Sequence, residues 1–427
     1  MGKLEKYSSY KDSKVDWIGE IPKHWTITKL KYLGTSTIGL TYNPNNLCNK
    51  EEGTLVLRSS NIQNGKLTFD DNVYVKSNIP KKLFIKENDI LICSRNGSRE
   101  LIGKCAIAKK EDEKYSFGAF TTVFRSKLNS YLFQILNSEI FKKQSGKFLT
   151  STINQLTVGN LNSFEIPLPP KEEQIKIASF LNEKTAQIDE VISQKQKLIE
   201  LLKERKQIVI NDAVTKGLDK DVEFKDSDVE WIGNIPKHWK LLANKYVFKL
   251  KKNLVGKKSS EYDLLSLTLE GIIKRDLDKG GKFPAEFDTY QEVKKGDFVF
   301  CLFDVEETPR TVGLSKYDGM ITGAYTVFSV KNINKEYLYY FYLNLDSKKR
   351  LKPLYTGLRN TISKDTFFSF KSFIPPKDEQ LQIVEYIENQ TTKIDKAIEL
   401  QQNYISKLKE YKASLIDSVV TGKVRVS

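Results

Sequence analysis

Two long stretches of the chain, residues 171–215 and 377–421, carry apolar residues at alternating spacings of three and four. Each begins directly after a Pro-Pro pair, has acidic residues in its first turn, and contains no internal proline or glycine. Such features are typical of a helix start followed by an uninterrupted helix. The spacing predicts a coiled-coil seam of about five heptads in each stretch, and each helix would be roughly 65 Å long. Two such seams in one chain most simply bury each other, so we expect a rod that holds the remaining domains at a fixed distance.

The segments outside these helices, roughly residues 20–165 and 234–373, follow a different pattern of short β-rich runs separated by turn residues. Examples are TLVLRSSNIQNGKLTF and NDILICS in the first segment, and KGDFVFCLF and GAYTVFSV in the second. Each segment also contains one aromatic-rich helical candidate, SYLFQILNSEIFKKQ and EYLYYFYLNLDSKKR. The mixture predicts an α+β fold for both segments.

The chain contains an internal repeat. Residues 10–25, YKDSKVDWIGEIPKHW, match residues 224–239, FKDSDVEWIGNIPKHW, and PPKEEQ at 169–174 matches PPKDEQ at 375–380. Between these flanks few counterparts survive, among them GAFT at 118–121 and GAYT at 323–326. This pattern indicates a common frame that carries two different inserts. We expect residues 1–25 to complete the repeated frame at one end of the helices, as residues 218–239 complete it at the other end.

The formal net charge of +15 is unevenly distributed along the chain. Residues 1–170 carry a net +9 and residues 217–376 a net +5, whereas the two helical stretches together contribute nothing. An excess of positive charge confined to the inserts suggests that the inserts contact nucleic acid. A lysine-rich solvated surface would give the same net charge. The four cysteines form no C-x-x-C pair, and the sequence shows no signal peptide or long apolar run. We therefore expect a cytoplasmic protein without disulfides.

Motifs for catalysis are scarce. The sequence has no G-x-x-x-x-G-K-[ST] motif, and its two histidines, His24 and His238, both belong to the repeated I-P-K-H-W. We therefore expect no catalytic residue and no metal site in this chain. A carboxylate–lysine nuclease cluster is too short a pattern to exclude, but nothing repeats such a cluster in both halves.

The repeated motifs resemble those of the specificity subunits of type I restriction–modification systems. The resemblance rests on W-I-G-x-I-P-x-H-W at 17–25 and 231–239, on P-P-K-[ED]-E-Q, on the Ile-Asp pair inside each helix, and on V-T-x-G at 214–217 and V-T-G-K at 420–423. It covers essentially the whole chain and implies two mixed α/β target recognition domains separated by two long antiparallel coiled-coil helices, with pseudo-two-fold symmetry. The implied organisation is a first recognition domain at 1–170, a first conserved helix at 171–216, a second recognition domain at 217–376, and a second helix with its tail at 377–427.

The resemblance also implies a function and partners. Each recognition domain would read one half of a split, asymmetric double-stranded DNA site, and the helices would set the gap between the halves. The chain would assemble with two adenine methyltransferase subunits and two ATP-dependent restriction/translocase subunits. S-adenosylmethionine, ATP and Mg²⁺ would belong to those partners, and this chain would hold no cofactor.

Reading a base requires side chains that bridge to base edges, most often Arg to guanine and Asn or Gln to adenine, while Lys and Arg also bind phosphates. Polar loops of the inserts supply such residues. The candidates are Arg58, Ser59, Asn61, Arg95, Asn96, Ser98, Arg99, Lys147, Thr152 and Asn154 in the first domain, and Lys274, Arg275, Arg310, Thr311, Arg359, Asn360 and Thr361 in the second. Arg99 and Arg275 each precede an acidic residue that can pair with them, and any of these positions can also be an ordinary surface turn.

Two other classes of function remain open on the sequence alone. The chain could be a self-sufficient nuclease or methyltransferase with its own active site, in which case the purified chain would cut or methylate DNA. Alternatively, it could be a coiled-coil scaffold whose globular ends bind proteins, in which case it would not bind DNA at any salt concentration.

Overall fold

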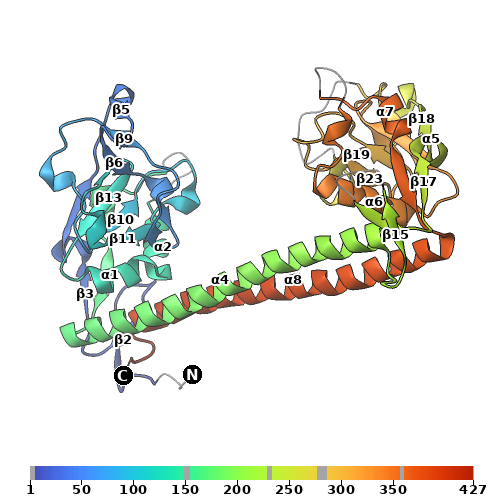
Figure 1. The fold of residues 1–427 in the computed structure, drawn as a ribbon. Coiled ribbons are helices and arrows are strands. Elements are labelled where there is room, and N and C mark those ends of the chain that lie inside the picture. The colour runs from blue at the N-terminus through green and yellow to red at the C-terminus, as the bar shows by residue number, and fades with distance from the viewer. Residues whose placement is uncertain (1–4, 149–153, 228–232, 277–285, 356–359, 427) are drawn as a thin grey trace. The chain divides into compact units, whose positions relative to one another are not determined.

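The computed structural model describes residues 5–148, 154–227, 233–276, 286–355 and 360–426. The chain divides into two compact units, Met1–Lys195 with Asn403–Ser427, and Gln196–Gln402, which we call the first and second units. Each unit holds one globular domain and one half of each of two long helices, α4 (Lys171–Lys216) and α8 (Lys377–Val420) (Figure 1).

The long helices form where the heptad pattern predicts them, and their seams are buried or half-buried in both units. In the first unit, Ile188 from α4 and Leu415 from α8 belong to one apolar core. In the second unit, Ala213 near the end of α4 shares a core with Ile387 near the start of α8. Since the start of each helix pairs with the end of the other, the predicted antiparallel pairing is confirmed within each unit.

The first domain is built on an antiparallel four-stranded sheet with the strand order β11-β10-β13-β4. These strands are β4 (Thr35–Ile38), β10 (Ile90–Cys93), β11 (Cys105–Ile107) and β13 (Thr121–Arg125). A second sheet has the order β12-β6-β9-β5 and comprises β5 (Leu47–Cys48), β6 (Thr54–Leu57), β9 (Tyr74–Val75) and β12 (Ser116–Phe117). Strands β7 (Ile62–Gln63) and β8 (Lys66–Leu67) form a hairpin whose turn residues, Asn64 and Gly65, both have positive φ, as two-residue hairpins require.

The aromatic-rich segment of the first domain is helical, but it is broken in two. It forms α1 (Asn129–Leu136) and α2 (Glu139–Gly146), and α3 (Val158–Asn162) follows. At the break, the Asn137 amide donates to the Phe133 carbonyl over 2.8 Å, and the Ser138 hydroxyl donates to the Ile135 carbonyl over 2.6 Å. Polar side chains that bond to nearby carbonyls in this way compete with helix continuation. The predicted single helical segment is therefore two helices.

The second domain repeats the first sheet with the strand order β23-β22-β25-β18. Its strands are β18 (Phe248–Lys251), β22 (Phe298–Phe300), β23 (Val312–Leu314) and β25 (Thr326–Val330). The insert also contains the pairs β19 (Leu265–Thr268) with β20 (Gly271–Lys274), and β21 (Gln291–Val293) with β24 (Gly319–Ile321). Its helices are α5 (Asn244–Val247), α6 (Lys335–Ser347) and α7 (Lys364–Ser369).

Short 3-10 helices connect several strands of both domains. They are η1 (Leu30–Tyr32), η2 (Pro44–Asn46), η3 (Ser59–Asn61), η4 (Lys81–Leu83), η5 (Arg99–Leu101), η6 (Lys110–Asp112), η7 (Gly256–Glu261) and η8 (Lys352–Leu354).

The repeated frame matches residue by residue in the two units. Strand β1 (Tyr10–Asp12) pairs with β2 (Glu20–Pro22) as β15 (Phe224–Asp226) pairs with β16 (Asn234–Pro236). Strand β3 (Thr26–Lys29) pairs with β14 (Glu165–Leu168) as β17 (Lys240–Ala243) pairs with β26 (Lys371–Ile374). The buried hydroxyls of Tyr131 and Tyr337 donate to the Pro167 and Phe373 carbonyls, at 2.8 and 2.9 Å. The internal repeat is thus a repeat of contacts as well as of sequence.

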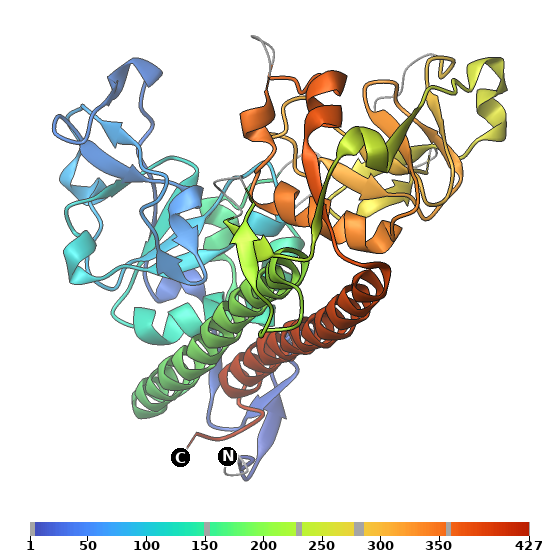
Figure 2. The ribbon, with the colours of Figure 1, turned by 45° about the vertical axis from the view of Figure 1, so that its right-hand side comes forward.

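The two chain ends complete the first unit. The segment before β1 lies beside the segment after α8 (Figure 2), and Glu5 forms an antiparallel bridge with Arg425. A Cβ on Gly422, just after α8, would lie 2.3 Å from Pro22 Cδ, and a Cβ on Gly217, just after α4, would lie 3.4 Å from a Trp239 ring carbon. Each helix end therefore packs on one copy of the I-P-K-H-W motif, as the repeat predicts.

Candidate nucleic-acid interface

In the first domain, the polar loop after β10 is fixed to the sheet by its backbone. Arg95 forms an isolated antiparallel bridge with Gln155, and its amide donates to the Phe120 carbonyl over 3.0 Å. Its guanidinium lies 5.2 Å from the centre of the Phe120 ring. The rigid backbone places an exposed cation and an exposed aromatic ring side by side.

Side-chain hydrogen bonds hold the neighbouring candidates together. The Asn96 amide donates to the Ser59 hydroxyl over 3.1 Å, and its oxygen accepts from the Ser98 amide over 3.0 Å. Asn154 donates to the Gly97 carbonyl over 3.1 Å. Three segments far apart in the sequence therefore meet at one polar surface, which we call the first polar cluster: Arg58, Ser59, Arg95, Asn96, Ser98 and Asn154.

Two members of the loop after β6 have different surroundings. Arg58 donates to the exposed Asp71 carboxylate over 2.7 Å, which leaves it close to the surface. Asn61, in contrast, is buried, accepts from the Arg58 amide over 2.8 Å, and donates to the Thr68 carbonyl over 2.9 Å. Asn61 therefore shapes the loop that presents Arg58, and its amide is already used within the protein.

The remaining first-domain candidates lie elsewhere or are not described. Arg99 donates to the Gly146 carbonyl over 3.3 Å, at the end of α2. The Lys147 ammonium lies 3.4 Å from the centre of the Trp17 ring, so it is held against the frame. Thr152 falls outside the described residues.

In the second domain, a buried carboxylate orients Arg310. Asp346, from α6, is 2% exposed and lies 3.6 Å from the Arg310 guanidinium. The same guanidinium donates to the Leu269 carbonyl over 2.7 Å. Thr311 is buried, and its amide donates to Asp346 over 3.0 Å, so Thr311 supports the arginine without reaching the surface. The forked guanidinium of Arg310, which we call the Arg310 fork, lines a hollow of about 520 Å³, which we call the Arg310 hollow. The lining also includes Thr268, Thr308 and Tyr325.

The segment after η8 supplies the next candidates of the second domain. Asn360 is exposed with φ 48°, and its carbonyl accepts from the Asp304 amide over 2.9 Å. Thr361 forms an isolated antiparallel bridge with Phe303, which matches the bridge between Arg95 and Gln155 in the first domain. Arg359 falls outside the described residues.

Lys274 and Arg275 lie at the end of β20. Lys274 forms a 2.5 Å ion pair with Asp263, which raises the pKa of the lysine, mainly through the hydrogen bond to that carboxylate. Arg275 is exposed, and its amide donates to the Leu264 carbonyl over 2.8 Å. The structure does not place either residue in the lining of the Arg310 hollow.

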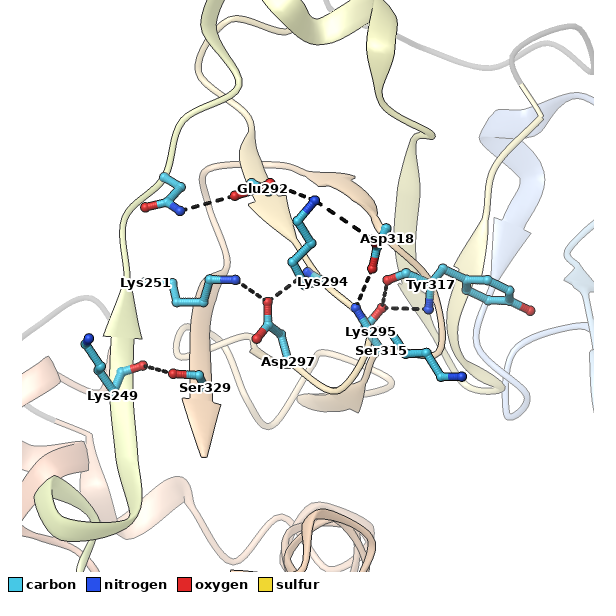
Figure 3. Close-up of polar contacts among 11 residues, drawn as sticks. Lys249, Lys251, Glu292, Lys294, Lys295, Asp297, Ser315, Tyr317, Asp318 and Ser329 are labelled. Atoms are coloured by element: carbon cyan, nitrogen blue, oxygen red, sulfur yellow. Dashed lines mark hydrogen bonds and ion pairs between the residues drawn. The ribbon is translucent and has the colours of Figure 1, made fainter. Parts of the chain in front are cut away.

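Two lysines of the second domain form ion pairs with carboxylates of the same domain, as Figure 3 shows. Lys251 donates to the buried Asp297 over 2.6 Å, and Lys294 lies 2.9 Å from Glu292. Hydrogen bonds from Lys294 and Asn253 lower the pKa of Glu292. This network holds β18, β21 and the start of β22 together, and we assign it a structural role rather than phosphate binding.

Sequence reasoning about polar residues missed the aromatic members of both surfaces. Phe120 lies against Arg95, and Tyr325 stacks on Phe303 with ring centres 6.3 Å apart and planes 13° apart. Both Phe120 and Tyr325 belong to the repeated Gly-Ala-aromatic-Thr sequence, which was the available signal. The surfaces of the two domains therefore arise from the same frame but carry different side chains.

Burial and hydrogen bonds define the environment of two thiols and both imidazoles. Burial raises the pKa of the Cys93 and Cys301 thiols, so both remain neutral near pH 7. His24 and His238 bind carboxylates of the long helices, at 2.6 Å from Glu173 and 2.8 Å from Glu379.

Within the described ranges, no group of three or more His, Cys, Asp or Glu side chains is arranged to hold a metal ion. None of the helices in the described part of the chain combines the length and apolarity needed to span a bilayer.

Comparison with known proteins identifies relatives by sequence. A family model described as the type I restriction modification DNA specificity domain matches residues 22–201 and 292–410. The putative type I restriction enzyme MjaX specificity subunit of Methanocaldococcus jannaschii is 27% identical over 434 aligned residues, with 96% of each chain covered. The type I restriction enzyme EcoKI specificity subunit of Escherichia coli is 30% identical over 207 residues, which cover 47% of this chain and 44% of that protein.

Solved structures show the same fold at low sequence identity. A chain from a structural study of the assembly and conformational transition of a type I restriction–modification system aligns with a TM-score of 0.69 at 14% identity, covering 94% of this chain and 98% of that one. The HsdS subunit from Thermoanaerobacter tengcongensis aligns with a TM-score of 0.50 at 16% identity, covering 95% and 98%. With the family match over most of the sequence and the repeated frame in both units, these comparisons show that the chain belongs to the family of type I restriction–modification DNA specificity subunits.

Proposed function

We propose that the chain recognises a bipartite, asymmetric DNA site, with one half-site read by each domain. The observation that carries this proposal is the pairing of a common frame with different surfaces. Both domains share one sheet order and equivalent frame bonds, yet Arg95 and Gln155 in the first domain are replaced by Phe303 and Thr361 in the second. Two readers with one scaffold and unlike side chains would read two unlike sequences.

The partners and cofactors are part of the same proposal. The chain itself is the non-catalytic reader, and it directs two adenine methyltransferase subunits and two ATP-dependent restriction subunits to the site. S-adenosylmethionine, ATP and Mg²⁺ serve those subunits. The match to the DNA specificity domain over most of the sequence supports a reading role for this chain.

The decisive experiment exchanges one insert. Residues 26–165 are replaced by the corresponding segment of a relative that recognises another sequence, and methylated adenines are mapped in cells that express the hybrid with its methyltransferase. We expect one half-site to change while the other half-site and the spacer stay the same. A simultaneous change in both half-sites would exclude the two-reader proposal.

Two further outcomes separate the alternatives. Deleting one or two heptads from both long helices is expected to change the spacer or abolish methylation, with the half-site sequences retained. If the purified chain alone cut or methylated DNA, it would be an enzyme in its own right. If the chain bound no DNA at any salt concentration even with its methyltransferase, it would be a protein-binding scaffold.

A further inference from the structure

The repeated Gly-Ala-aromatic-Thr turn presents an aromatic ring from a rigid backbone in the first domain. The Phe120 carbonyl accepts hydrogen bonds from the Ser94 and Arg95 amides, both at 3.0 Å. The two residues before it are also held, because the Gly118 amide donates to Leu57 and the Ala119 amide to Leu40, both over 2.9 Å. The turn is therefore tied to three separate segments of the domain.

The ring that this turn carries is nevertheless 58% exposed. Single exposed apolar side chains are ordinary and need no explanation by themselves. Phe120 differs because its backbone is fixed and because it lies beside Arg95 of the first polar cluster. A ring held in place loses little conformational freedom when a partner covers it.

The second domain holds its ring in another way. Tyr325 stacks on Phe303, and its amide donates to the Thr322 carbonyl over 3.2 Å. Phe303 takes the place of Arg95, since each lies two residues after a cysteine whose thiol donates to its carbonyl. Tyr325 also lines the hollow of about 520 Å³ that the Arg310 fork faces.

Strand pairing explains why one ring projects and the other is recessed. Cys93 pairs with Thr121, whereas in the second domain Phe300, one position before the matching Cys301, pairs with Thr326. The repeated turn is therefore displaced by one residue along the neighbouring strand. Phe120 and Tyr325 directly precede β13 and β25, so the two rings start from different positions along the neighbouring strand.

The chemistry of the major groove limits what such a ring can contact. Every base edge in that groove presents hydrogen-bond donors or acceptors, and the one apolar group is the 5-methyl of thymine. An apolar ring placed among base-reading candidates matches that methyl group, and adjacent guanidinium groups such as Arg95 and Arg310 suit the neighbouring polar edges.

We propose that Phe120 and Tyr325 each contact the 5-methyl group of a thymine, one in each half-site. Phe120 meets its methyl group as a projecting ring beside Arg95. Tyr325 is part of the wall of the hollow that receives the other methyl group, with the Arg310 fork beside it. This inference rests on the proposed function, because it requires that each domain reads one half-site.

The test replaces each thymine of the mapped site in turn by deoxyuridine, which lacks only the methyl group. Binding is measured with the full chain assembled with its methyltransferase partner. We expect one thymine in each half-site to show an affinity loss of about three- to tenfold on replacement, the effect of exposing one buried methyl group. Phe120→Ala should abolish that sensitivity in one half-site, and Tyr325→Ala should abolish it in the other.

Matched controls use exposed aromatic residues of the same domains. Tyr32 and Tyr246 are 71% and 65% exposed and lie outside the two surfaces, so Tyr32→Ala and Tyr246→Ala should keep both sensitivities. Phe120→Ala should leave the salt dependence of binding unchanged, whereas loss of a phosphate-contacting cation lowers its slope by about one. Phe120→Leu keeps an apolar group and should retain part of the effect, with the unfolding midpoint unchanged in both variants.

The outcomes distinguish this inference from the proposed function. A wild-type complex that does not discriminate its mapped site would overturn the proposed function. If the complex discriminates its site but is insensitive to every deoxyuridine replacement, only this inference is overturned. The same holds if the sensitivity survives in Phe120→Ala and Tyr325→Ala. A half-site without thymine would overturn it for the corresponding domain.

Discussion

The Trp25 indole nitrogen donates a 3.0 Å hydrogen bond to Glu173, in the first turn of α4. The same bond joins Trp239 to Glu379 in the first turn of α8, also at 3.0 Å. Both tryptophans are almost completely buried, at 0% and 1% exposure. The repeated I-P-K-H-W and P-P-K-[ED]-E-Q motifs therefore meet in each unit, and the glutamate joins the domain to its long helix.

Replacing Glu173 by alanine should destabilise the first unit by roughly 1.5–3 kcal/mol, because the buried indole N–H would lose its charged acceptor. Tyr7 and His24 also bind this carboxylate, at 2.9 and 2.6 Å. Urea unfolding followed by tryptophan fluorescence measures the change. Glu172→Ala is the matched control, since Glu172 is an exposed neighbour in the same turn, and an equal loss from both variants would contradict the proposed role of Glu173.

The bond to Glu173 also predicts a pH dependence. Partial burial raises the pKa of Glu173, but hydrogen bonds from Trp25, His24 and Tyr7 outweigh it, so the net pKa is lowered. A carboxyl with a lowered folded-state pKa stabilises the fold above its unfolded-state pKa, and this contribution is lost as the pH falls through the folded-state value. The stability difference between wild type and Glu173→Ala should therefore shrink in acid, and a difference that grows below pH 4 would contradict this assignment.

A repeated ion pair links the long helices within each unit. The Lys412 ammonium lies 2.6 and 2.7 Å from the two oxygens of Asp189, and Lys206 lies 2.8 and 2.7 Å from those of Asp395. Partly exposed pairs of this kind contribute up to about 1 kcal/mol. Asp189→Lys and Lys412→Asp should each destabilise the first unit, and the double exchange should restore most of the loss in a thermal unfolding cycle. Additive losses in the double variant would show that the pair contributes nothing.

Gly422 should tolerate no side chain. Its φ is +71°, and an added Cβ would lie 2.3 Å from Pro22 Cδ and 2.5 Å from Pro22 Cγ. Gly19 has nearly the same φ, +72°, but open space around it. Gly19→Ala should therefore cost about 1–2 kcal/mol from backbone strain alone, and Gly422→Ala should cost roughly 1–3 kcal/mol more from the clash. Chemical denaturation of both variants checks the difference, and equal losses would show that the helix end adjusts freely.

The buried Asp89 should be essential to the first domain. Its carboxylate accepts from Arg125 over 2.7 Å and from the Lys86 amide over 2.8 Å, and its side chain is 1% exposed. Without Asp89, the partly exposed Arg125 guanidinium and the Lys86 amide would lose their acceptor, at a cost of about 1–3 kcal/mol. Asp89→Ala should lose this amount in urea unfolding. Asp71→Ala removes an exposed partner of Arg58 and should lose no more than about 1 kcal/mol; a comparable loss at both sites would refute the distinction.

Residues within the candidate surfaces show where sequence reasoning loses precision. Asn61 has the side chain expected of an adenine reader, yet it is buried and bonds to its own loop. Arg310 owes its direction to Asp346, 36 residues later, and no local pattern reveals that contact. Phe120 is apolar, so a search for polar base-reading side chains does not include it. Its position beside Arg95 follows from the pairing of β10 with β13. Such contacts depend on which loops meet at a sheet edge, and spacing along the chain carries no information about that.

The architecture of this protein can be predicted from its amino-acid sequence: two frame copies, two long helices with matching seams, and two unlike inserts, within a recognisable family. These features are visible because helix seams and repeated motifs are periodic and local, so their physical cause is written in neighbouring residues. Packing in three dimensions determines which polar residues reach the surface and which form hydrogen bonds inside the protein. It also determines where the aromatic rings point. Burial and long-range hydrogen bonds decide this, because a polar side chain that is bonded to a buried partner is not available at the surface.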